Sequence, residues 1–198
     1  KKRYILNVWD SEGVRYEEPK LKMMGIEAVK SSTPAPCRTM IKDALKLMMS
    51  GTEDEVIDFI ENARKEFKSL PPEQIAFPRT ASNVRKYKSS SDIYVKGTPI
   101  HIRGALLFNF YLKKKKLTNK YSAIENGEKI KFIYLKKPNI IQENVLSFIQ
   151  DFPTEFGLSQ YIDYELQFEK SFVYPLKAIL DAIGWEVEKK VTLESFFS

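Results

Sequence analysis

Hydrophobic and polar residues alternate along the first part of the chain in the manner of a β-strand. Tyr4, Leu6 and Val8 alternate with Arg3, Ile5 and Asn7, and Ile5 and Trp9 make the other face partly apolar. The polar stretch "DSEG" follows, with Gly13 able to adopt a positive φ. A second β-rich run, "VRYEE", comes next, so the pattern predicts a hairpin. The stretch "KLKMMGIEAVK" predicts a third strand, with Gly25 at a bulge or a point of close backbone approach.

The pattern then changes to the period of an amphipathic helix. In "SSTP", Thr33 or a serine is suited to cap a helix, and Pro34 fits its first turn. An apolar stripe runs to about residue 48, and Gly51 ends it. Thr52 and Glu55 then form a capping-box pattern before a second stripe that the prolines at 71–72 stop. Two helices joined by a short turn are therefore predicted.

The remaining chain mixes helices with few strands. We expect a loop over 80–99, a helix over 100–116, a strand at 129–137 and a short helix at 142–152. A long helix is expected from about 159 to 183, kinked at Pro175, with Gly184 just after its end. The predicted class is α+β, with a small antiparallel β segment followed by a mainly helical domain that contains a few strands.

Composition and motifs exclude several kinds of chemistry. The chain has 198 residues, lacks an apolar run long enough to span a membrane, and shows no signal-peptide pattern. Its single cysteine, Cys37, fits a reducing cytoplasm. One histidine, His101, cannot build a triad or a histidine-based zinc site, and no phosphate-binding glycine motif is present. The acids at 53–55 suit the first turn of a helix. We therefore expect binding rather than catalysis from these residues.

Charge is concentrated in the middle of the chain. Between Arg79 and Lys120 there are eleven Lys or Arg residues and one acid, Asp92, whereas the segment from Asp151 onward has nine acids and four bases. This distribution predicts a surface for a polyanion. The run Lys113–Lys116 taken alone is interpreted as solvated surface. The aromatic residues Phe108, Phe110 and Tyr111, at helical spacing beside leucines, are expected in the core.

Five stretches occur in an order that resembles a known family. They are "KKRY", "EPKLKMMGIEAVKSSTP", "HIRG", "FEKSFVYPL" and "EKKVTLESFFS". The chain resembles the C-terminal part of family B replicative DNA polymerases from T-even-like phages. The resemblance implies the end of the palm at 1–30, the thumb at 31–185 and a clamp-binding tail at 186–198. It also implies a role in a DNA-directed DNA polymerase whose catalytic Mg²⁺ binds palm aspartates that this fragment lacks.

The resemblance further implies partners and site residues. Expected partners are primer–template duplex DNA, a sliding clamp and the remainder of the polymerase, in the cytoplasm of an infected bacterium and without a membrane. Lys2 and Lys22 are expected to donate to minor-groove acceptors, which every correct base pair offers at nearly the same position. The full set of expected DNA-binding residues is Lys1, Lys2, Arg3, Tyr4, Lys22, Arg85, Lys86, Tyr87, Lys88, Lys96, His101, Arg103, Lys170 and Lys177.

Two of these expectations concern particular helical segments. Arg103 with Gly104 at a helix start is expected to present a guanidinium and backbone N–H groups to one phosphate. In the tail, Leu193, Phe196 and Phe197 share one face of a helical turn and are expected to bind the clamp, the alternative being that the tail folds back on the thumb. Competing interpretations are a stand-alone module that binds RNA or single strands, and a structural protein.

Overall fold

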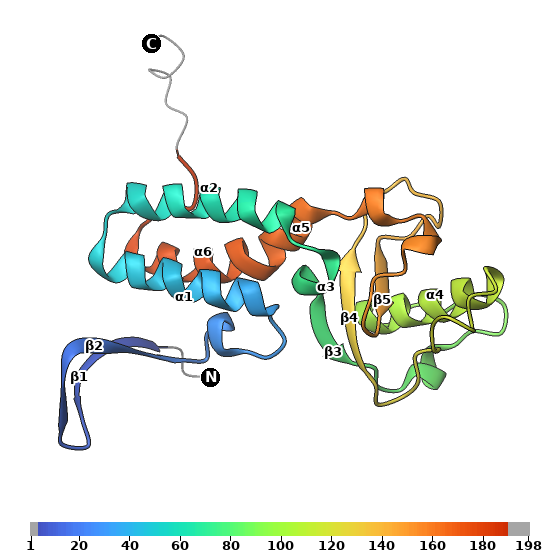
Figure 1. The fold of residues 1–198 in the computed structure, drawn as a ribbon, viewed down its shortest axis with the longest axis horizontal. Coiled ribbons are helices and arrows are strands. Elements are labelled where there is room, and N and C mark those ends of the chain that lie inside the picture. The colour runs from blue at the N-terminus through green and yellow to red at the C-terminus, as the bar shows by residue number, and fades with distance from the viewer. Residues whose placement is uncertain (1–3, 190–198) are drawn as a thin grey trace, which may run out of the picture. The chain divides into compact units, whose positions relative to one another are not determined.

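The computed structural model describes residues 4–189, and the chain folds as two compact units (Figure 1). Unit 1 combines Lys1–Lys68 with Phe168–Ser198, and unit 2 is the continuous segment Ser69–Gln167. Helices and small antiparallel sheets occur together, so the predicted α+β class is confirmed. This partition does not assign a palm or a thumb, and the predicted boundaries at 30 and 185 stay predictions.

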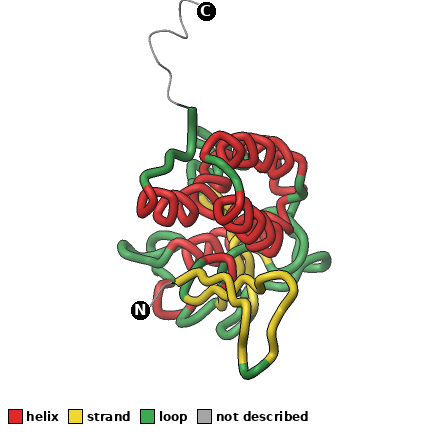
Figure 2. Tube along the Cα trace, turned by 90° about the vertical axis from the view of Figure 1, so that its left-hand side faces the viewer, coloured by secondary structure: helices red, strands yellow, loops and turns green. Residues whose placement is uncertain are grey.

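Unit 1 begins with the predicted hairpin. Strand β1 (Tyr4–Ser11) pairs antiparallel with β2 (Val14–Met24), and Figure 2 shows both as long strands joined by a short turn. The turn residues Glu12 and Gly13 have φ values of 56° and 78°, which is the backbone of a two-residue primed turn. The predicted third strand is wrong. The pairing register shifts between Val8 and Asp10, where β2 contains more residues than β1. Strand β2 therefore continues as one long strand through the region predicted as a third strand. Gly25, with a φ of 73°, then ends it.

Two long helices follow the hairpin, as predicted. Helix α1 (Ala35–Ser50) and helix α2 (Glu53–Ser69) run alongside each other in Figure 1. The Thr52 amide donates to Glu55 Oε2 at 2.7 Å, and the Glu55 amide donates to Thr52 Oγ1 at 3.3 Å, so the capping box is confirmed. The predicted cap of α1 is wrong, because Pro34 occupies the cap position and the neighbouring Thr33 is buried.

The predicted long helix is interrupted. It consists of α5 (Tyr164–Phe168), a π-helical turn at Glu169–Val173, α6 (Tyr174–Leu180) and a final 3₁₀ turn that ends at Gly184, whose φ is 75°. Pro175 cannot donate a backbone hydrogen bond, and the change of helix type immediately before it accommodates that loss. The expected kink thus takes the form of a π turn.

Aromatic packing builds the core of unit 1 around this π turn. Phe168 and Phe172 are fully buried, and the Phe168 ring lies 5.2 Å from the ring of Phe67 on α2. The Cys37 thiol donates to Ser171 Oγ at 3.3 Å. Burial raises the pKa of Cys37 to about 11, against the opposing effect of the Ser171 hydrogen bond. The cysteine is therefore a buried apolar group of low reactivity.

Unit 2 is a three-stranded antiparallel sheet covered by a helix. The strands β3 (Phe77–Thr80), β4 (Lys129–Tyr134) and β5 (Val145–Phe148) lie in that order, and the short α3 (Pro72–Ile75) precedes them. The strand at β4 is confirmed, β3 was not expected, and the predicted helix over 142–152 is wrong. All four residues of β5, Ser147 included, are buried, so the strand has no alternation of buried and exposed positions that would reveal it.

Helix α4 (Ile100–Lys114), predicted correctly, packs directly on β5. Gly104 makes this approach possible. A Cβ atom at Gly104 would lie 2.4 Å from Ser147 Oγ, 2.7 Å from Ser147 N and 3.0 Å from the Leu146 carbonyl carbon. The Ser147 hydroxyl also donates to the His101 carbonyl oxygen at 2.8 Å. Gly104 is therefore a packing residue between helix and strand.

Amide side chains fasten the loops of unit 2. Asn139 Nδ2 donates at 2.6 Å to the carbonyl oxygens of both Lys136 and Glu143. Gln167 Nε2 donates at 2.7 Å to the Ile75 carbonyl oxygen. Asn139 and Gln167 are both buried, so these hydrogen bonds are made away from solvent, where leaving a polar group unpaired is costly.

Gly104→Ala tests the close approach of α4 to β5. Helix propensity alone predicts that alanine stabilises a helix by about 1 kcal/mol. We expect the opposite, a loss of roughly 1–3 kcal/mol in the free energy of unfolding, because the added methyl group collides with the strand backbone. Denaturant titration measures it. Adding Ser147→Ala removes only the hydroxyl contact, so the double variant should remain destabilised; a gain in stability for Gly104→Ala would contradict the packing argument.

Candidate nucleic-acid interface

The hairpin presents two of the predicted DNA-binding residues on one face. Tyr4 pairs with Met24, Leu6 with Lys22 and Val8 with Lys20, and residues that pair directly across strands share a face. Lys22 is exposed. Lys20, which was not among the expected residues, joins this face, and its amine lies 3.9 Å from the centroid of the Tyr16 ring. Strand alternation in "PKLKMM" could have indicated that Lys20 and Lys22 point the same way.

Six of the predicted residues cannot be placed. Lys1, Lys2 and Arg3 at one end of the chain, and Leu193, Phe196 and Phe197 at the other, lie outside the described residues. Their proposed roles stay predictions.

The basic loop of unit 2 carries exposed and unpaired charges. Arg85, Lys86 and Tyr87 lie on a 3₁₀ turn at Val84–Tyr87. The backbone of Lys88 forms an isolated antiparallel β-bridge with that of Tyr94. Arg85, Lys86 and Lys88 are exposed, as is Lys96 further along the loop. None of these four bases forms an ion pair with another residue of the described range 4–189. They are therefore available to a polyanion without loss of an internal ion pair, although the Lys86 amine lies 5.6 Å from the centroid of the Tyr87 ring.

Arg103 occupies a different setting from the one predicted. Its own amide donates to the Pro99 carbonyl oxygen at 2.8 Å, so it lies beyond the free N–H groups of the first turn. Its guanidinium donates from Nη2 to Asn144 Oδ1 at 2.5 Å and lies 5.8 Å from the Tyr94 ring. Gly104 faces β5 rather than solvent, so the expected site of backbone amides plus guanidinium is wrong. Arg103 Nε is buried and has no hydrogen-bond partner within residues 4–189.

Arg79 is a residue that the site prediction missed. It lies on β3, and its guanidinium is 5.6 Å from the Phe132 ring. Burial lowers the pKa of His101, and the positive charge of Arg79 lowers it further. Burial raises the pKa of Tyr134, an effect that the charges of Arg79 and Arg103 oppose. The fold thus brings Arg79, His101, Arg103 and Tyr134 within electrostatic range of one another, although they come from three different elements.

Lys170 and Lys177 do not form the simple pair that their spacing predicted. Lys177 is ion-paired with Asp181 at 2.7 Å, and the Lys170 amine lies 5.8 Å from the Tyr174 ring. The π turn between them changes the rotation per residue, so a spacing of seven no longer guarantees a common face. Both side chains are exposed, but Lys177 would have to leave Asp181 to contact a phosphate.

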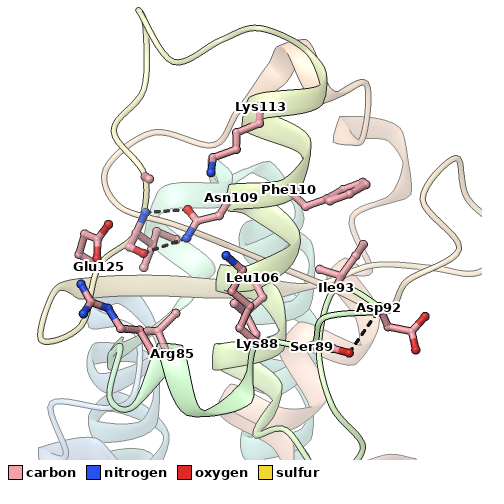
Figure 3. Close-up of a pocket in the computed structure, with 13 residues that line it drawn as sticks. Arg85, Lys88, Ser89, Asp92, Ile93, Leu106, Asn109, Phe110, Lys113 and Glu125 are labelled. Atoms are coloured by element: carbon pink, nitrogen blue, oxygen red, sulfur yellow. Dashed lines mark hydrogen bonds between the residues drawn. The ribbon is translucent and has the colours of Figure 1, made fainter.

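A groove in unit 2 brings two bases of the basic loop together with one base from the end of α4. It lies between the basic loop, α4 and the segment 123–125, and it has a volume of about 310 Å³ (Figure 3). Arg85 and Lys88 come from the loop, and Lys113 comes from the end of α4. Lys113 had been interpreted as ordinary solvated surface, whereas the fold places it at this groove.

Unit 2 carries the entire formal net charge of the chain. The segment Ser69–Gln167 has 15 Lys and Arg against 9 Asp and Glu, whereas the rest of the chain has 17 of each. The whole formal net charge of +6 is therefore carried by this unit.

Comparison with known proteins agrees with the resemblance. The chain is 30% identical over 201 residues to the DNA-directed DNA polymerase of Enterobacteria phage T4, and 35% identical over 202 residues to that of Escherichia phage RB69. Both alignments cover the whole chain. The chain is therefore similar over its whole length to one segment of these phage DNA polymerases. It spans 22% of the length of each of these two polymerases. None of the protein-family models matches it.

The fold of the chain also has a solved counterpart. The family B DNA polymerase from the hyperthermophilic archaeon Pyrobaculum calidifontis matches 94% of the chain with a TM-score of 0.56. The match covers 21% of the archaeal chain at 13% sequence identity, so it shows a shared fold.

Two further observations concern metal sites and membrane spans. Within residues 4–189, no group of three or more His, Cys, Asp or Glu side chains is placed to hold a metal ion. No helix in the same range is both long and apolar enough to cross a membrane.

The depressed pKa of His101 predicts a pH effect on stability. Because the folded pKa is below the unfolded value of about 6.5, the unfolded chain binds more protons near that pH, and stability falls as pH falls. We expect the free energy of unfolding to drop more between about pH 7.5 and about pH 5.5 in the parent chain than in His101→Gln. Carboxylates titrate alike in both proteins. Denaturant titrations across that range measure the difference, and parallel pH profiles would contradict it.

Proposed function

We propose that the chain is the part of a phage DNA polymerase that grips primer–template duplex through a palm end and thumb and links to a sliding clamp. The observation that carries this proposal is the match to two phage DNA polymerases over the whole chain. The unpaired bases of unit 2 support it. The longer protein would act in the cytoplasm of an infected bacterium and transfer nucleotides, with Mg²⁺ held by palm aspartates outside this segment.

The hairpin face would contact the minor groove. Lys22, together with Lys2, would donate to purine N3 or pyrimidine O2 acceptors, which are present in every correct base pair. Tyr4 lies on the face of Lys22 and would pack against the primer. Lys20 extends the same face by two residues, about 7 Å along the strand. Such donors can form hydrogen bonds with any correct base pair, so they bind duplex of any sequence. At a mispair they lose their acceptor.

The basic loop would contact phosphates. Its exposed bases are free of internal ion pairs, so contact with DNA releases counterions without breaking a bond in the protein. His101 and Arg103 would contribute from the start of α4, with Arg79 beside them. Lys170 would extend the contacts from unit 1, and Lys177 would do so after leaving Asp181.

The C-terminal residues would bind the clamp. Leu193, Phe196 and Phe197 are spaced as one apolar face of a helical turn, and the stem before them is charged. At the start of this region, Glu188 is ion-paired with Arg64 at 3.5 Å and Lys189 with Asp58 at 2.8 Å. These contacts tie residues 188 and 189 to α2, so binding would involve the residues beyond them.

Salt dependence tests the phosphate contacts. If the loop and the start of α4 supply about 3–5 contacts, the logarithm of duplex affinity should fall against the logarithm of salt concentration with a slope of roughly −3 to −4. Arg85→Gln with Lys86→Gln should flatten the slope by about 2. Lys136→Gln with Lys137→Gln changes two exposed bases of the same unit and serves as the matched control. Equal slopes for the two double variants would place the contacts elsewhere.

A double substitution in the tail tests the clamp. Phe196→Ala with Phe197→Ala should abolish binding to the sliding clamp and leave duplex affinity unchanged, since no proposed DNA contact lies there. If the tail instead folds into the thumb core, removing each ring should cost roughly 3–5 kcal/mol of stability. Clamp titration by calorimetry, with thermal melting of the same variant, separates these outcomes. A large drop in melting temperature would refute clamp binding by a free tail.

A further inference from the structure

The groove of unit 2 has an apolar floor of buried side chains. Val84 and Leu106 are each 6% exposed, and Ile124 is 1% exposed. At about 310 Å³ the groove lies at the lower end of the range for small-ligand sites, so it has room for about one nucleotide unit.

One wall of the groove is held in place by a pair of hydrogen bonds. Asn109 Nδ2 donates to the Ile124 carbonyl oxygen at 2.9 Å, and the Ile124 amide donates to Asn109 Oδ1 at 2.7 Å (Figure 3). This pair fastens the segment 123–125 to α4. Because the wall is already fixed, a ligand would not have to order it on binding.

The charges around the groove favour an anion near its centre. None of Arg85, Lys88 and Lys113 forms an ion pair with another described residue. Two acids, Asp92 and Glu125, also line the groove. In Figure 3 the carboxylate of Asp92 points away from Lys88 and Lys113, whereas Glu125 lies on the side of Arg85.

Phe110 gives the groove an aromatic edge that the sequence pattern did not predict. It was expected in the core with Phe108, but Phe108 is 1% exposed and Phe110 is 42% exposed. Ile93 lines the groove with Phe110 on the same side in Figure 3. Exposed aromatic rings beside unpaired cations are the composition of sites that bind single-stranded nucleic acid.

We propose that this groove binds one unpaired nucleotide of a single-stranded nucleic acid. The phosphate lies between Lys88 and Lys113, and the base or sugar packs on Phe110 and Ile93. A base inside a duplex is stacked on both faces and cannot offer one to Phe110, so the groove selects unpaired strands. This site goes beyond the proposed duplex grip, because Phe110 and Lys113 belong to no proposed duplex contact.

Binding of short labelled oligonucleotides to the whole chain tests the proposal. Oligothymidylate and oligouridylate of about six nucleotides, measured by fluorescence anisotropy, show whether DNA or RNA is preferred. We expect Phe110→Leu to weaken single-strand binding by roughly fivefold or more. Lys113→Gln should weaken it and flatten the salt slope by about 0.7. Lys115→Gln, a neighbouring exposed lysine outside the groove, is the matched control and should have a smaller effect.

Duplex binding by the same variants separates this site from the duplex grip. Phe110→Leu and Lys113→Gln should leave duplex affinity within about twofold of the parent chain, which supports a separate site. Equal losses for Lys113→Gln and Lys115→Gln, an unchanged affinity for Phe110→Leu, or displacement of the oligonucleotide by an acidic peptide at lower concentration would each overturn the proposal. Lys113 is exposed, so its variant remains informative if Phe110→Leu lowers the melting temperature.

Discussion

The close approach of α4 to β5 at Gly104 is the constraint on which unit 2 depends. With no Cβ at this position, the helix lies against the strand backbone, and the Ser147 hydroxyl reaches the His101 carbonyl oxygen. This contact fixes the position of α4 relative to β5 and hence the position of Arg103 relative to Asn144. It also fixes the outer side of α4, where Asn109, Phe110 and Lys113 form one wall of the groove. Arg103 and the α4 residues that line the groove are thus placed by one packing contact.

Neutral amides fasten much of unit 2, and this leaves its bases available. Asn109 fastens the segment at 123–125, Asn139 the turn before β5, and Gln167 the residues before β3. In a loop held by a lysine–carboxylate pair, the lysine is already ion-paired within the protein. An amide side chain forms comparable hydrogen bonds and leaves the lysines unpaired. The bases of the loop at 85–96 are consequently unpaired in the described chain. Lysine–carboxylate pairs are present elsewhere, between Lys120 and Glu155 in unit 2 and between Lys177 and Asp181 in unit 1.

The sequence predicted elements where a local signal is unambiguous. The capping box at Thr52 and Glu55, the glycine turn of the hairpin and the apolar stripe of α1 are such signals, and each was confirmed. Strand β5 was mistaken for a helix because burial on both faces removes the alternation that distinguishes a strand. The π turn before Pro175 depends on how unit 1 packs around it, which no local pattern records. Candidate interface residues could be proposed from sequence where bases cluster in the chain, whereas Arg79 and Lys113 become candidates only through the fold.

The unequal division of charge has a consequence for how the molecule meets its surroundings. A polyanion at a distance is attracted by unit 2, with its formal charge of +6, and only weakly by the balanced charges of unit 1. Such asymmetry exerts a torque, so diffusional encounters begin with unit 2 facing the polyanion before any short-range contact forms. At physiological ionic strength the screening length is about 8 Å, so this orientation arises only in the last approach. Within this chain, unit 2 therefore carries the charge that would orient such an encounter.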